Sequence, residues 1–205
     1  ADRPEDARPT EQHLELLRAL AEKPGVAVAV VSGRPRESLE KLFAEAPRVW
    51  LVAEHGGWLR GDGAWHSTTS ANPGALDALT KALEGIASHY KKAWVERKTW
   101  SVCLHYRGVR QRDRTELTVR ANAAFDESTA GRPGYERLEG SATFEVRPSG
   151  IRKSAAIPWM RDHVGSGARI LALGDDLTDE DMFRALGAHD EGVLVGTDVT
   201  RATAA

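Results

Sequence analysis

Five acidic residues gather within seven positions, from Asp175 to Asp181, directly after the short apolar run that begins at Ile170. In a chain of formal net charge −2, like charges this close repel one another unless a cation or a helix dipole offsets them. Carboxylate oxygens are the ligands that Mg²⁺ prefers. We therefore predict a Mg²⁺ site formed by Asp175, Asp176 and Asp179. The alternative is a plain acidic first turn of a helix, whose start Thr178 and the acids after it indicate.

Two other groups of this chain suit the binding of a phosphoryl group. Ser32 and Gly33 follow an apolar run, and Lys153 stands at the start of the helix that precedes the acidic strand. A hydroxyl and backbone N–H groups bind phosphate oxygens, and a lysine neutralises the charge on them. Taken singly, Ser-Gly is commonly a turn and a lysine at a helix start is commonly solvated. With the acidic cluster they predict a phosphoryl site.

The elements that carry these groups alternate between strand and helix. Short apolar runs predict the strands Val26–Val31, Val49–Ala53, Arg169–Leu173 and Gly192–Val195, and a glycine-rich hairpin around Gly61 follows the second of them. Helices are predicted from a cap at Thr10 to Lys23-Pro24-Gly25, from Pro35 to Phe43, and from Ser154 to Val164. This alternation predicts a parallel sheet, which keeps its ligands at the carboxyl ends of the strands.

The pattern changes from about Asn72. A helix opened by Pro73, with Leu76, Leu79, Leu83 and Ile86 at helical spacing, precedes the strand candidates Ala93–Arg97 and Trp100–Arg107. A helix over Thr115–Phe125 then precedes Tyr135–Leu138 and Thr143–Val146. The order helix, strand, strand thus occurs twice. This repeat predicts a separate α+β layer inserted into the first fold.

Composition excludes several classes of protein. The charge of −2, without a basic stretch, argues against a nucleic-acid partner, and no apolar run approaches the roughly 20 residues of a membrane span. The single Cys103 excludes an intrachain disulfide, so we expect a cytoplasmic protein. Dinucleotide-binding and P-loop glycine motifs are absent from the sequence. A receiver-type signalling domain would carry its acids after the first strand and its lysine after the last, the reverse of the order here.

These residues carry a family resemblance. The chain resembles motifs II, III and IV of the haloacid-dehalogenase (HAD) superfamily, in that order, at Ser32-Gly-Arg34, at Lys153 and at Gly174-Asp-Asp-Leu-Thr-Asp-Glu-Asp-Met-Phe183. It also resembles trehalose-6-phosphate phosphatases in four motifs: Ala53-Glu-His-Gly56, His105-Tyr-Arg107, Glu145-Val-Arg-Pro148 and Gly-Asp-Asp-x-Thr-Asp-Glu. The resemblance implies an α/β fold, with a HAD-like Rossmannoid core and parallel sheet over residues 1–71 and 149–205. An inserted α+β (αββαββ) cap domain would span residues 72–148.

The same resemblance implies a chemistry. Mg²⁺-dependent hydrolysis of trehalose 6-phosphate would pass through an aspartyl-phosphate, with Ser32 and Lys153 gripping the transferring phosphoryl group. It places Gly33 and Arg34 beside that group, and Glu96, Lys98, Arg107 and Glu145 among the residues that read the sugar. The alternative for these four is an ordinary charged face of a half-exposed sheet. Relatives often carry a lysine where Ser141 stands, so another glycosyl phosphate is an alternative substrate.

One family motif has no counterpart in the chain. Nothing matches Asp-x-Asp-Gly-Thr, which supplies the nucleophile and the acid/base, and Asp2 and Asp6 lie in a proline-rich stretch. We therefore expect a chain that begins just after its catalytic strand, is inactive by itself, exposes sheet edges and binds Mg²⁺ weakly. The alternative is a non-catalytic, phosphatase-like domain of a trehalose-synthesis protein, which binds sugar phosphate or a partner. A trehalose-phosphate synthase domain or subunit is the expected partner.

Overall fold

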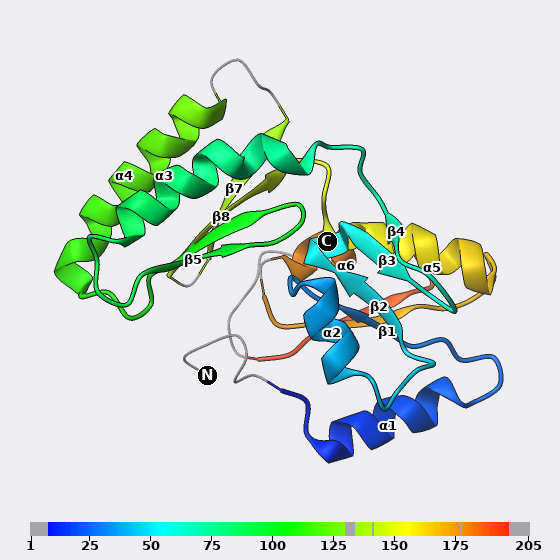
Figure 1. Ribbon diagram of the computed structural model, residues 1–205. Helices are drawn as coiled ribbons and strands as arrows, with labels where there is room; N and C mark the ends of the chain where they lie inside the picture. The colour runs from blue at the N-terminus through cyan, green and yellow to red at the C-terminus, as the bar shows by residue number, and fades with distance from the viewer. Residues whose placement is uncertain (1–7, 130–133, 141, 177, 197–205) are drawn as a thin grey trace. The chain divides into compact units, whose positions relative to one another are not determined.

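A computed structural model describes residues 8–129, 134–140, 142–176 and 178–196. These residues form two compact units (Figure 1). One, here called the core unit, runs to Thr69 and resumes at Ile151, and the other, the inserted unit, runs from Ser70 to Gly150. Asp2, Asp6 and Ser141, which the sequence singled out, lie outside the described residues.

The first sheet of the core unit has the order β1-β2-β3-β4. Strand β1 (Ala29–Val31) is parallel to β2 (Trp50–Ala53), and β3 (Trp58–Arg60) and β4 (His66–Ser67) continue antiparallel as the predicted hairpin. Strand β1 is shorter than the predicted Val26–Val31. The reason is local, because the Val26 N–H bonds back to the carbonyl of Lys23 in a turn instead of joining the sheet.

The second sheet of the core unit contains β9 (Leu171–Gly174) and β10 (Glu191–Leu194), which are parallel with Leu171 opposite Glu191. Among the described strands β1 pairs with β2 alone and β9 with β10 alone, so the parallel strands fall into two pieces. One edge of β1 and one edge of β9 therefore have no strand partner within the described part of the chain.

Two helices begin at predicted signals. Helix α1 (Glu11–Ala21) starts after Thr10, whose side chain accepts a hydrogen bond from the His13 N–H while His13 Nδ1 accepts one from the Thr10 N–H. This reciprocal cap satisfies two backbone donors. Helix α2 (Arg36–Leu42) follows Pro35, and its Leu39 is buried in the core together with Val49 and Leu51.

Helices α5 (Ala156–Val164) and α6 (Asp179–Arg184) supply the apolar cover of β9. Ile157 and Met182 form one buried cluster with Ile170 and Ala172. Val31, the last residue of β1, packs against the same cluster, so the carboxyl end of β1 lies beside β9. Alternation puts Leu171 and Leu173 on the other face of β9, where they are 58% and 59% exposed.

The inserted unit has the predicted order of two helices and four strands. A 3₁₀ turn over Pro73–Leu76 leads into α3 (Asp77–Ala87), and β5 (Trp94–Arg97) and β6 (Val102–His105) follow. Then come α4 (Gln111–Thr129), which extends past the predicted end at Phe125, β7 (Tyr135–Gly140) and β8 (Thr143–Pro148). The sheet is antiparallel in the order β5-β6-β8-β7, and α3 and α4 lie side by side (Figure 1).

The sheet of the inserted unit has one apolar and one polar face. Val102, Leu104 and Phe144 are fully buried in a cluster with Leu83 of α3 and Leu117 of α4. Since strand side chains alternate, the residues between them face the other way: Cys103 in β6, and the polar Glu96 in β5, His105 in β6 and Glu145 in β8.

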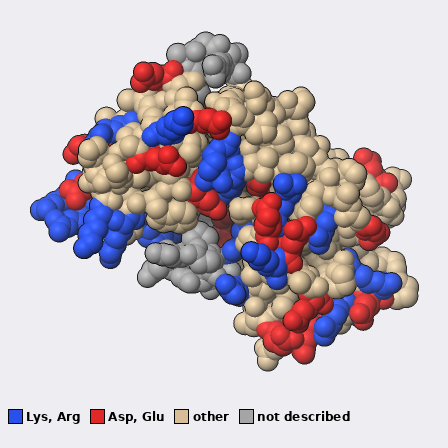
Figure 2. All heavy atoms as spheres, in the orientation of Figure 1, with Lys and Arg blue, Asp and Glu red and all other residues tan. Residues whose placement is uncertain are grey.

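Charged side chains of both signs are interspersed over the surface in Figure 2. Among the residues that the structure describes, no helix is long and apolar enough to cross a membrane.

Candidate active site

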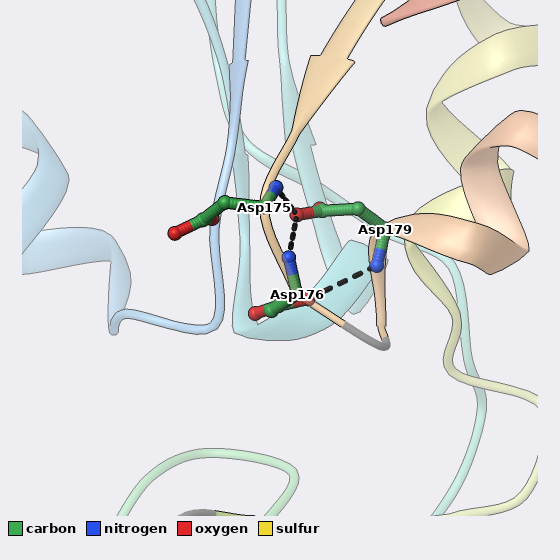
Figure 3. A group of neighbouring side chains, drawn as sticks. All are labelled: Asp175, Asp176 and Asp179. Carbon is green, nitrogen blue, oxygen red and sulfur yellow. Dashed lines mark hydrogen bonds between the residues drawn. The ribbon is translucent and has the colours of Figure 1, made fainter. Parts of the chain in front are cut away.

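The acidic turn after β9 closes on Asp179. Its Oδ2 accepts hydrogen bonds from the backbone N–H groups of Asp175, at 3.0 Å, and Asp176, at 3.2 Å (Figure 3). A Cβ atom on Gly174 would lie 2.4 Å from the Cβ of Asp179, so the start of α6 can fold back over the strand end only above a glycine.

Asp176 caps helix α6. The helix begins after Thr178, as predicted, but the Thr178 side chain makes no capping hydrogen bond. Instead Asp176 Oδ1 accepts from the N–H groups of Thr178, at 2.8 Å, and Asp179, at 3.0 Å, and from the Thr178 hydroxyl. Burial raises the pKa of Asp176, but the hydrogen bond from Thr178 and the charge of Lys153 outweigh burial and hold this pKa below its usual value.

Lys153 is buried against the acidic turn. It opens the 3₁₀ turn Lys153–Ala155 before α5 and is only 6% exposed. Its Nζ lies 2.7 Å from Asp179 Oδ1 and 3.4 Å from Asp176 Oδ1. The alternative of a solvated lysine at a helix start is therefore wrong, because this ammonium group is desolvated and paired with two carboxylates.

The acidic turn has the oxygen donors of a divalent cation site. One carboxylate oxygen from each of Asp175, Asp176 and Asp179 lies within 4.8 Å of the others. Both oxygens of Asp179 are already engaged, Oδ2 by the backbone and Oδ1 by Lys153. Asp175 is exposed and its carboxylate points away from Asp179 in Figure 3. Three oxygens in this arrangement fit a hard cation such as Mg²⁺, and Asp175 is the most available ligand.

Ser32 lies in the turn after β1. Its N–H bonds to the Val52 carbonyl, its carbonyl accepts from the His55 N–H at 2.9 Å, and its Oγ accepts from the Arg34 N–H at 3.2 Å. Gly33 has no room for a side chain, since a Cβ there would lie 2.3 Å from His55 Nε2. The Arg34 carbonyl accepts from the Glu54 N–H at 2.9 Å. The Ser32 turn is thus held by the segment that follows β2.

The segment after β2 also contacts the backbone before Lys153. Glu54 and His55 have φ values of 48° and 58°, in the left-handed region that non-glycine residues rarely adopt. Gly56 has φ 98°, and a Cβ there would lie 2.2 Å from the Arg152 carbonyl oxygen. These contacts connect Ser32 through His55 and Gly56 to Lys153, and Lys153 connects to Asp179. The sequence pattern did not identify His55 as part of the site, although Glu-His-Gly-Gly directly after a strand was an available signal.

The polar face of the inserted unit carries a second charged cluster. Lys98 Nζ lies 2.9 Å from Glu145 Oε1, which also accepts the Ser101 hydroxyl at 2.6 Å. His105 Nε2 lies 3.0 Å from Glu96 Oε2. The strand register explains this grouping, because Glu96 lies opposite Cys103 and Cys103 lies opposite Glu145. The sequence did not single out Ser101, and it gave His105, which belongs to the motif His105-Tyr-Arg107, no role in the site.

The charges in this second cluster shift one another's pKa values. Burial lowers the pKa of Lys98, but the carboxylates of Glu145 and Glu96 outweigh burial and raise it. Burial raises the pKa of Glu96, but the hydrogen bond from His105 and the charge of Lys98 outweigh it and hold this pKa below its usual value. Burial and the neighbouring Glu145 raise the pKa of the Cys103 thiol.

Arg107 occupies a different position from Glu96, Lys98 and Glu145. It lies exposed in the turn after β6, where its carbonyl accepts a hydrogen bond from Arg114 at 2.6 Å. The inserted unit therefore joins three of the four predicted sugar-reading residues by strand pairing and side-chain contacts, with the fourth in the turn that follows.

This fold is that of a HAD-like phosphatase: parallel strands carry a serine turn and an acidic turn at their carboxyl ends, a buried lysine precedes α5, and an αββαββ unit interrupts the chain. The predicted fold class is thereby confirmed. Residues 1–203 match the sequence model described as Trehalose-phosphatase. The chain belongs to the trehalose-phosphatase family.

Several named relatives are similar to the chain. It is 35% identical over 200 residues to a bifunctional trehalose-6-phosphate synthase/phosphatase of Thermoproteus tenax. The match covers 97% of this chain and 27% of that relative. It is 30% identical to a trehalose-phosphate phosphatase of Mycobacterium marinum, over 100% of the chain and 53% of the relative. The chain thus spans about a quarter to a half of the length of these relatives.

Among solved structures, the C-terminal domain of the trehalose-6-phosphate phosphatase of C. albicans superimposes with a TM-score of 0.79. The sequences are 25% identical, and the match covers 89% of this chain and 67% of that one.

Proposed function

We propose that the protein containing these residues hydrolyses trehalose 6-phosphate to trehalose and inorganic phosphate, with Mg²⁺ as its cofactor. The observation that carries the proposal is the buried Lys153, held 2.7 Å from Asp179 beside an acidic turn whose Asp175 carboxylate stays available. A cation held beside oxygen ligands can neutralise the charge of a phosphate ester. The trehalose-phosphatase family supports this substrate class.

In this proposal each group of the core unit has one task. Asp175, with Asp176 and Asp179 directly or through water, would hold Mg²⁺, which when bound offsets negative charge on the phosphoryl oxygens. The Ser32 hydroxyl and the Gly33 N–H would donate to those oxygens, and Arg34, whose N–H bonds to Ser32 Oγ, would lie beside them. Lys153 has three N–H donors. Its contacts with Asp179 and Asp176 occupy two of them, which leaves one for the transferring phosphoryl group.

The chemical step needs a carboxylate nucleophile, and the family motif that supplies it has no match in this sequence. In the proposed route a carboxylate oxygen attacks phosphorus, the bond from phosphorus to the sugar oxygen breaks, and that oxygen leaves as a hydroxyl after receiving a proton from a second carboxylic acid. Water then hydrolyses the aspartyl-phosphate to phosphate. Because no Asp-x-Asp-Gly-Thr occurs in the 205 residues, we propose that both carboxylates are supplied from outside them and that these residues alone are inactive.

The inserted unit would act as the cap domain that recognises the sugar, and we keep its predicted span of residues 72–148. Carboxylates and cations suit a hydroxyl-rich disaccharide because they accept and donate strong hydrogen bonds. Glu96, Lys98 and Glu145 would supply them on the polar sheet face, with Arg107 in the adjoining turn. Closure of such a cap excludes water during the reaction.

Two further parts of the proposal concern the setting of the protein. The bifunctional name of the T. tenax relative favours a trehalose-phosphate synthase domain or subunit as partner, in trehalose biosynthesis. The single cysteine, Cys103, is buried and has no disulfide, which favours the cytoplasm.

A second candidate function is a non-catalytic domain that binds sugar phosphate or a partner enzyme. The missing Asp-x-Asp-Gly-Thr motif favours it. The product of the complete reading frame decides between the two when phosphate release is measured from trehalose 6-phosphate and other glycosyl phosphates.

We expect release with trehalose 6-phosphate, loss of release with EDTA and recovery with Mg²⁺. Asp175→Asn should lower the rate at least about 100-fold, because it removes the most available metal ligand. Phosphatase activity that is unaffected by EDTA and by Asp175→Asn would refute the metal site. The absence of phosphate release from every phosphate ester tested would favour the second function. Calorimetry should show weak Mg²⁺ binding by the 205-residue chain alone.

A further inference from the structure

Three side chains form a continuous contact on the polar face of the inserted unit: Trp94, His105 and Glu96. Trp94 lies directly opposite His105 in the pairing of β5 with β6. Their rings are stacked, with centroids 3.9 Å apart and planes 6° from parallel. Glu96 lies two residues after Trp94, on the same face of β5, and its Oε2 is 3.0 Å from His105 Nε2.

The hydrogen bond has a defined direction. An ionised carboxylate can only accept, and the low pKa of Glu96 keeps it ionised at neutral pH, so Nε2 of His105 carries the proton and donates it. No other hydrogen bond to the Glu96 carboxylate is present in the described part of the chain, which leaves Oε1 able to accept from a ligand hydroxyl. His105 therefore fixes one oxygen of Glu96 and leaves the other available.

The surrounding charges show why this carboxylate needs a dedicated partner. Lys98, the residue after β5, attracts Glu96, but its ammonium group donates to Glu145 of β8, at 2.9 Å. Glu145 repels Glu96, and the Cys103 thiol between them on β6 is neutral because burial raises its pKa. His105 is thus the one described side chain that holds Glu96 directly. Its own side chain is 13% exposed and has one ring face covered by Trp94.

We infer that His105 is a positioning residue for Glu96, and that Trp94 holds the His105 ring in the plane in which its N–H meets the carboxylate. The inference rests on the proposed function, in which Glu96 binds a sugar hydroxyl of the substrate. Trp94 and His105 touch neither phosphate nor metal in this scheme. They act on affinity and specificity for the sugar through the orientation of one carboxylate.

Three substitutions separate the two contacts. His105→Phe keeps a ring stacked on Trp94 but removes the N–H donor. His105→Gln keeps a side-chain N–H donor but removes the ring. Trp94→Leu keeps the His105 N–H but removes the stacking. His89→Phe is the matched control, since His89 is an exposed histidine of the same unit after α3.

Two measurements on the complete reading-frame product test the inference. Calorimetry in the presence of EDTA, which should prevent hydrolysis of the ligand, gives the Kd of trehalose 6-phosphate, and the carboxyl ¹³C shift of Glu96 followed over pH gives its pKa. We expect His105→Phe to weaken binding about tenfold, the effect of one charge-assisted hydrogen bond, and to raise the pKa of Glu96. His105→Gln should recover most of both effects, Trp94→Leu should weaken binding about threefold, and His89→Phe should change neither quantity.

The Glu96→Gln variant completes a double-mutant cycle. If His105 acts through Glu96, His105→Phe should weaken binding no further once Glu96 is replaced. Additive losses in the cycle, or a Glu96 pKa that does not move in His105→Phe, would overturn the inference. If the unaltered protein fails to bind trehalose 6-phosphate, the proposed function is wrong. The pKa measurement needs no ligand and still decides whether His105 holds Glu96.

Discussion

The core unit and the inserted unit each bury a lysine beside a carboxylate, but they hold the carboxylate by different means. In the core unit Lys153 lies 2.7 Å from Asp179, whose other oxygen is fixed by two backbone N–H groups of a turn. In the inserted unit Lys98 lies 2.9 Å from Glu145, which accepts from the side chain of Ser101, the residue before β6.

This difference shows what each site depends on. The core arrangement needs particular turn conformations, with Gly174 and Gly56 at points of close approach. The inserted arrangement needs strand register, which places Glu96, Cys103 and Glu145 in one row across the sheet. A site built from backbone groups suits a chemical group that all substrates share. A site built from side chains can change its ligand specificity by substitution without a change of fold.

Lys153→Met should have the largest effect, because it leaves the buried Asp179 carboxylate without its cation. We expect the free energy of unfolding to fall by about 3–5 kcal/mol. Urea denaturation measures it, and Lys41→Met, at an exposed site in α2, is the control. A loss of less than about 1 kcal/mol would show that the backbone donors alone stabilise Asp179.

Lys98→Met should destabilise the protein by about 2 kcal/mol, less than the change in the core unit, because Ser101 still donates to Glu145. Urea denaturation against Lys81→Met, an exposed lysine of α3, measures the difference. If Lys98→Met costs more than Lys153→Met, the inserted unit rather than the core unit depends more strongly on its buried lysine.

Asp176→Ala should cost about 1 kcal/mol, because the first turn of α6 loses its capping acceptor. Thr178→Ala should cost less, about 0.5 kcal/mol, since it removes one hydroxyl donor and no cap. Thermal unfolding ranks the two variants, and amide exchange at Asp179 locates the effect. Equal losses would contradict the assignment of Asp176 as the capping side chain.

The smallest expected effect is a dependence of the inserted unit on acid pH. The pKa of Glu96 is lower in the folded state than its ordinary value of 4.5, so its contribution to stability is complete above pH 4.5. The contribution is lost as pH falls through the lower folded pKa. Amide protection factors in β5 and β6, which correct for the intrinsic pH dependence of exchange, should fall over that range in the unaltered protein and show less pH dependence in Glu96→Gln.

Local patterns predicted the elements well but not how they are buried. Thr10 predicted the start of α1, and Pro73 predicted the start of the first helix of the inserted unit. The repeated order of helix, strand, strand predicted the order of elements in that unit. The burial of Lys153 depends on segments more than 20 residues away, such as Asp179 at a separation of 26. No local pattern contains that information.

The unpredicted members of both sites are isolated polar residues. His55 lies against Gly33 and His105 holds Glu96 across a strand pair, and only the folded backbone reveals these two contacts. Asp176 and Thr178 are both good capping residues, and the turn conformation decided between them. Strand register places Glu96 and Glu145 in one row across the sheet, on either side of Cys103. That register is set by the pairing of the whole sheet and not by a local pattern.

Gly56 has a consequence for how variants of this family are interpreted. It lies against the Arg152 carbonyl, one residue before Lys153, and has no charge and no role as a ligand. A methyl group there would displace the backbone that carries the lysine. In a genetic screen a Gly56→Ala variant should therefore resemble a substitution of Lys153, because it disturbs the pairing of Lys153 with Asp179 without changing any charged residue.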